Sequence, residues 1–92
     1  MSGFALQTGG YKNITATGNV SPIACKLLGI FVASASSTPT IAVYDSATTT
    51  TTAPITGAVA AVGGTWLTIP VGTSAGVYVV ITGTVDATVV FA

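Results

Sequence analysis

Short apolar runs separated by turn residues fill most of the 92-residue chain, and this pattern predicts β-strands. Val, Ile, Thr, Tyr and Phe dominate the runs, while Gly, Pro, Ser and Asn stand between them. Apart from Ala, residues that strongly favour helices are scarce. The pattern therefore predicts an all-β fold, a single antiparallel sandwich domain over residues 1–92 with about seven to eight short strands.

Turn signals recur at intervals of roughly 8–12 residues, as expected for a sandwich or barrel. In the segment IACKLLGIFVA at 23–33, apolar residues occupy both the odd and the even positions, which predicts a central strand with both faces covered. Gly29 in the middle of this segment predicts a bend or bulge. The segments 75–83 and 84–92 are predicted to form a closing hairpin through Gly83. The other predicted strands lie at 11–17, 40–45, 55–62 and 65–71, with turns at Gly18-Asn19, 34–39 and Gly63-Gly64.

A threonine-rich stretch at 46–54 is predicted to be a loop that faces solvent or a partner. Pro54 cannot donate a hydrogen bond within a central ladder, and the threonine hydroxyls do not suit an apolar interior. Asp45 and Ser46 precede the stretch and are expected to cap a turn by bonding to their own backbone.

Only four side chains in the chain are charged, namely Lys12, Lys26, Asp45 and Asp86. An ordinary globular protein has roughly 25% charged residues, and a net charge near zero promotes association. The composition therefore predicts an oligomer whose surface is covered by copies of the chain or by a partner. Nucleic acid is not an expected partner, because binding it requires clustered basic residues. A membrane is not expected either, since no apolar run reaches about 18 residues.

Enzymatic, metal and cofactor chemistry is not indicated by the sequence. Asp45 and Asp86 could in principle form a glycosidase pair, but a strand end and a strand interior favour structural roles, and their spacing does not fit a metal site. Cys25 has no histidine to activate it and is predicted to be a small buried residue. We expect a non-enzymatic protein without a cofactor.

The candidate interface residues are Phe4, Leu6, Trp66 and Tyr78. Trp66 is the only tryptophan, and it suits a core position as well as an interface or a sugar-stacking surface. Residues 1–10 are a candidate extended N-terminal arm. They lack the basic start and the long apolar stretch of a signal peptide, so none is expected.

Three segments of the chain resemble small virion proteins of tailed bacteriophages: LLGIFVASASSTPTIAVYDS, API at 53–55, and GVYVVITGTVDATVVF at 76–91. The resemblance covers most of the chain from about residue 20. It implies a jelly-roll-like β-sandwich without an active site. It also implies a role in capsid decoration or another role at the particle surface. We therefore expect a capsid cement or decoration protein whose partners are the major capsid protein and copies of itself, as a dimer or trimer.

Such a protein would be made in the host cytoplasm and would lie on the capsid surface of the virion. Two other functions stay open. One is a tail-fibre or baseplate module that binds host glycan through Trp66 or Tyr78, and the other is a self-assembling β fibre or surface coat.

Overall fold

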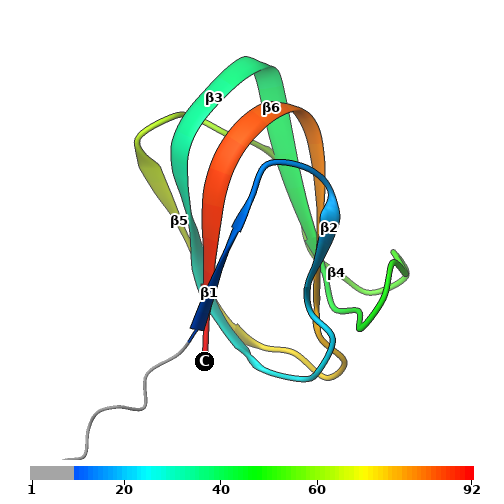
Figure 1. The fold of residues 1–92 in the computed structure, drawn as a ribbon. Helices are drawn as coiled ribbons and strands as arrows, with labels where there is room; N and C mark the ends of the chain where they lie inside the picture. The colour runs from blue at the N-terminus through cyan, green and yellow to red at the C-terminus, as the bar shows by residue number, and fades with distance from the viewer. Residues whose placement is uncertain (1–9) are drawn as a thin grey trace, which may run out of the picture.

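The computed structural model describes residues 10–92, and within them the chain forms six antiparallel strands and no helix (Figure 1). The strands are β1 (Gly10–Ile14), β2 (Gly18–Ser21), β3 (Lys26–Tyr44), β4 (Pro54–Ala60), β5 (Thr65–Gly72) and β6 (Val77–Phe91). The all-β prediction is confirmed. Over the described part of the chain, no helix is present that could cross a membrane.

Two long strands, β3 and β6, form the frame of the molecule. They pair with each other almost from end to end and arch together over one end of the fold (Figure 1). On one side of the arch they are flanked by β1 and β5, and on the other side by β2 and β4. The sheet is thereby folded into two layers, β1-β6-β3-β5 and β2-β6-β3-β4.

The arch lies where both long strands carry small or polar residues. In β6 it includes Gly83, whose φ of 81° lies in the left-handed region that glycine adopts without strain. Opposite it, β3 advances four positions, from Ser36 to Thr40, while β6 advances only two. Extra residues in one strand of a pair bend the sheet and increase its twist. These residues therefore produce the fold into two layers.

Two predicted chain reversals are wrong because they are bends within continuous strands. Residues 34–39 continue β3 through the arch, and Gly83 bends β6 where a hairpin between 75–83 and 84–92 was predicted. The predicted turn at Gly18-Asn19 is also wrong, since β2 begins there. The described residues thus form six strands, fewer than the seven to eight predicted, and the jelly-roll pattern of connections stays a prediction.

The core lies between the two layers and is made of aliphatic side chains. In β6 every second residue is buried, as expected for a strand with one face inward, and the alternation is interrupted only at the arch. Full burial of one such side chain stabilises the fold by about 1.5–3 kcal/mol. The largest fully buried side chains are Leu27, Ile30, Val32, Ile41, Val43, Val77, Val79 and Val89.

The predicted irregularity at Gly29 is confirmed. The pairing of β3 with β5 and with β6 shifts register between Leu27 and Gly29. The prediction that both faces of 23–33 are covered is wrong, because Phe31 points outward and is 42% exposed. The sandwich therefore presents part of its central strand to the outside.

Candidate functional site

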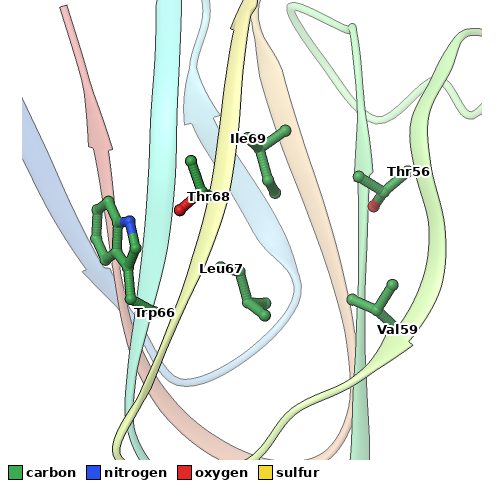
Figure 2. A pocket seen from close by; sticks show the side chains of 6 residues that line it. All are labelled: Thr56, Val59, Trp66, Leu67, Thr68 and Ile69. Carbon is green, nitrogen blue, oxygen red and sulfur yellow. The ribbon is translucent and has the colours of Figure 1, made fainter.

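An open cleft of about 320 Å³ lies between β4 and β5 (Figure 2). Among the described strands, β4 and β5 each pair with β3 alone and not with each other, so each has one unpaired edge. Thr56 and Val59 line the cleft from β4, and Trp66, Leu67, Thr68 and Ile69 line it from β5.

The cleft is an opening into the side of the apolar core. Figure 2 shows Leu67 and Ile69 extending from β5 toward β4, and both side chains pack against the core while only partly buried. On the opposite side of the sandwich, Ile14 and Val20 are each only 7% exposed. The interior is thus closed at β1 and β2 and open at β4 and β5.

Trp66 lies at the surface, so its predicted core position is wrong, and its role at an interface or as a sugar-stacking surface stays a prediction. Its side chain is 46% exposed, and it is paired across the strands with Phe31. A Cβ added to Gly29 would lie 2.6 Å from Trp66 Cζ2, so the indole ring covers the space that this glycine leaves open. Glycine at position 29 therefore lets Trp66 lie close to the sheet while its outer part stays accessible.

Tyr78 lies elsewhere on the molecule. It is partly buried between the inward-facing Val77 and Val79, and its ring centroid is 6.2 Å from that of Tyr44. Tyr78 is on the layer that contains β2 and β4, whereas Trp66 is on the layer that contains β5. The structure does not bring these two predicted interface residues together.

The other two predicted interface residues, Phe4 and Leu6, lie outside the described residues. The lining residues that sequence reasoning missed are those of β4 together with Leu67, Thr68 and Ile69. A signal for them exists in TWLTIPV, where both alternating sets of positions contain large apolar residues. An edge strand with two apolar faces has one face toward the core and one toward the outside.

The carboxylate of Asp45 binds the backbone of a distant connection. It accepts hydrogen bonds from the backbone N–H groups of Ser74 (2.9 Å), Ala75 (2.8 Å) and Gly76 (3.2 Å). These bonds, that of Ser74 foremost, lower the pKa of Asp45 below its ordinary value. The expectation that Asp45 caps its own turn is wrong, and the residue instead joins the end of β3 to the connection before β6.

Ser46 caps the threonine-rich loop as predicted. Its buried Oγ accepts hydrogen bonds from the backbone N–H groups of Thr48 (3.0 Å) and Thr50 (3.1 Å). The Asn19 amide donates to the carbonyl oxygens of Ser46 and Thr48, each at 3.1 Å. Residues 48–53 are exposed, so the predicted loop is confirmed, and its base is fixed to β2.

The remaining charged groups show no catalytic arrangement. Asp86 accepts a hydrogen bond from Asn13 Nδ2 at 2.7 Å, and Lys12 Nζ donates to the carbonyl oxygen of Asn19 at 3.1 Å. In residues 10–92 no group of three His, Cys, Asp or Glu side chains could hold a metal ion. Cys25, predicted to be buried, is only partly buried and packs against the core.

The lining of the cleft can bind an apolar surface. Its six residues include no nucleophilic thiol, no carboxylate and no base, and their polar atoms are two threonine hydroxyls and the indole N–H. Comparisons with protein-family models, with curated proteins and with solved structures give no match.

Proposed function

We propose that the protein is a non-enzymatic structural component of a bacteriophage particle, a capsid cement protein that bridges and stabilises neighbouring capsid subunits. The observation that carries the proposal is an almost uncharged surface with large apolar side chains exposed on it. The sequence has four charged residues, and Phe31, Val59, Val62 and Trp66 are all more than a third exposed. A surface of this kind suits a protein that is covered by partners on a particle.

The proposed mechanism is stabilisation by binding. A protein that binds the assembled lattice, and not its separated subunits, shifts the equilibrium toward the lattice by mass action. The folded sheet supports this function because its two layers share β3 and β6, so a force applied to one layer is carried by backbone into the other. Partners of the chain would be the major capsid protein and copies of itself on the capsid surface.

Particles that lack the protein provide the test. We expect them to assemble but to open at lower temperature or under milder osmotic shock than complete particles, because the stabilising ligand is missing. Addition of the purified protein should restore their resistance. Release of packaged DNA during a temperature ramp measures the opening, and particles that are equally resistant without the protein would contradict a cement function.

A tail-fibre or baseplate module that binds host glycan is the second candidate function, and the exposed ring of Trp66 favours it. Sugar rings stack on tryptophan, and the hydroxyl groups of Thr56 and Thr68 line the same cleft. Under this function, depleted particles would stay resistant to heat but would fail to adsorb to host cells. A copy number of a few to dozens per particle would also favour a tail location over hundreds of capsid sites.

A further inference from the structure

We propose that residues 54–72, here called the β4–β5 side, are the surface through which copies of this chain associate with one another. This rests on the proposed function, in which the protein acts as an oligomer, and it names the surface and its occupant. The β4–β5 side comprises β4, the connection at 61–64, and β5.

Three of the six large hydrophobic side chains that are exposed among the described residues lie on the β4–β5 side. Among residues 54–72 only Ala61 is buried. Val59, Val62 and Trp66 on this side are exposed, and Phe31 lies next to it as the cross-strand neighbour of Trp66. Among the described residues, the other large exposed hydrophobic side chains, Tyr11 and Ile23, lie outside this side. Contiguous apolar exposure of this kind marks interaction sites.

The cleft shows that the β4–β5 side is also the open side of the core. Leu67 and Ile69 belong to the inward-facing set of β5, yet they remain accessible from the gap between the two layers (Figure 2). Apolar surface that is removed from water contributes about 25 cal/mol per Å². A partner that covers the gap therefore completes the burial of core side chains in addition to covering Trp66.

The distribution of charge indicates that this partner is a second copy. None of the four charged residues of the chain lies within residues 54–72. In a symmetric contact each surface meets its own copy, so any charge near the axis would face an identical charge, which is unfavourable. A different protein could be recognised by complementary charges around the rim, and this side offers none. Two copies of an uncharged surface of apolar side chains and threonines can meet without placing like charges opposite each other.

The size of the surface is sufficient for a stable contact. The chain exposes 4612 Å² in total, and residues 54–72 make up about a fifth of the sequence, with twelve residues exposed, six partly buried and one buried. This side therefore offers about 900 Å², compared with about 800 Å² that each partner buries in a standard interface.

Two prolines show which kind of contact this is. Pro54 is in β4, and Pro70 is in β5 where its pairing with β3 shifts register. Proline lacks the N–H group that an added strand would require, and proline on an edge strand limits edge-to-edge pairing. The copies therefore associate through side chains, with Trp66 and the cleft at the centre, and not by extending the sheet.

A charge placed on this side tests the inference with isolated protein and no particles. Thr68→Lys puts a positive charge among the cleft residues, and Thr84→Lys puts the same charge at the exposed arch of β6 as the matched control. Sedimentation velocity over a concentration series measures association. Trp66, the only tryptophan, reports the burial of this same side through its emission wavelength and its quenching by acrylamide.

We expect the wild-type protein to sediment as an oligomer with blue-shifted, protected Trp66 fluorescence. Thr68→Lys should weaken association by about tenfold or more and expose Trp66, since an unpaired charge in an interface is strongly unfavourable. Thr84→Lys should behave as wild type, and circular dichroism should show that both variants are folded.

Three results would overturn the inference. One is a wild-type monomer with quenchable Trp66. Another is an oligomer that persists in Thr68→Lys, because the copies would then meet elsewhere. The third is a protein that is monomeric at every concentration and whose Trp66 becomes exposed when residues 2–9 are deleted. That result would mean that the chain's own N-terminal segment, and not a second copy, occupies the cleft. An oligomer that associates as expected but fails to stabilise particles would contradict the proposed cement function and leave this inference intact.

Discussion

At the scale of single residues, the carboxylate of Asp45 joins two segments that are distant in the sequence. Three backbone N–H groups bind its carboxylate and lower its pKa below the ordinary value of 3.8. A lowered pKa in the folded state stabilises the protein above the unfolded-state pKa. This stability is lost as the pH falls through the lower, folded-state pKa.

Asp45→Asn should therefore be less stable than wild type at neutral pH, and the difference should shrink in acid as the wild-type carboxylate becomes protonated. Urea unfolding at a series of pH values from neutral to about 2 measures this. Asp86→Asn is the matched control, because Asp86 accepts its side-chain hydrogen bond from Asn13 and leaves the Asp45 contacts unchanged. Equal stability of Asp45→Asn and wild type at neutral pH would show that the backbone contacts of Asp45 contribute nothing.

At the scale of elements, β5 is an edge strand and contains Pro70, which has no N–H group to donate to an added strand. Pro70→Thr restores an N–H group and adds a residue that favours strands, so we expect it to promote sheet extension and fibre growth. Thioflavin fluorescence and electron microscopy during incubation measure this, with a lag time at least severalfold shorter than for wild type.

Pro22→Thr, in the exposed connection between β2 and β3, is the control for Pro70→Thr. It removes a proline with the same effect on the unfolded chain, about 0.4–1 kcal/mol, without changing an edge. Equal fibre growth in the two variants would show that Pro70 does not protect β5, and that general destabilisation causes aggregation.

The sequence predicts most strands but not the way in which two of them fold over. Residue types and the period of two place β1, β4 and β5 within a few residues, and Gly63-Gly64 forms the predicted turn. At 34–39 and at Gly83 the same small and polar residues that signal turns produce bends, because the partner strand continues alongside and keeps the pairing. Local composition shows where a chain changes direction, whereas long-range pairing decides whether a strand ends there.

The candidate site was only partly predictable for the same reason. Trp66 is conspicuous as the only tryptophan, and in the segment TWLTIPV that contains it apolar residues occupy both alternating sets of positions. Whether such a strand is central or at an edge depends on which strands lie beside it, and the sequence does not state this. β5 proved to be an edge, and so its second apolar face forms an accessible surface.

At the scale of the whole molecule, the near absence of charge predicts how self-association responds to solution conditions. The β4–β5 side contains none of the four charged residues, so electrostatic screening has little to act upon there. We expect the dissociation constant of the oligomer to change by less than about twofold from about 0.05 M to about 0.5 M sodium chloride, a range over which the Debye length shortens roughly threefold.

Sulfate and temperature should act on the same equilibrium in a characteristic way. Sulfate is excluded from protein surfaces and should strengthen association at equal ionic strength, whereas cooling should weaken it, because apolar burial is less favourable in the cold. Sedimentation equilibrium with varied sodium chloride, with sulfate and at lowered temperature measures these effects. A tenfold weaker association in high sodium chloride would mean that Lys12, Lys26 or the two aspartates hold the copies together. The contact surface would then include these charged residues and would not be the β4–β5 side.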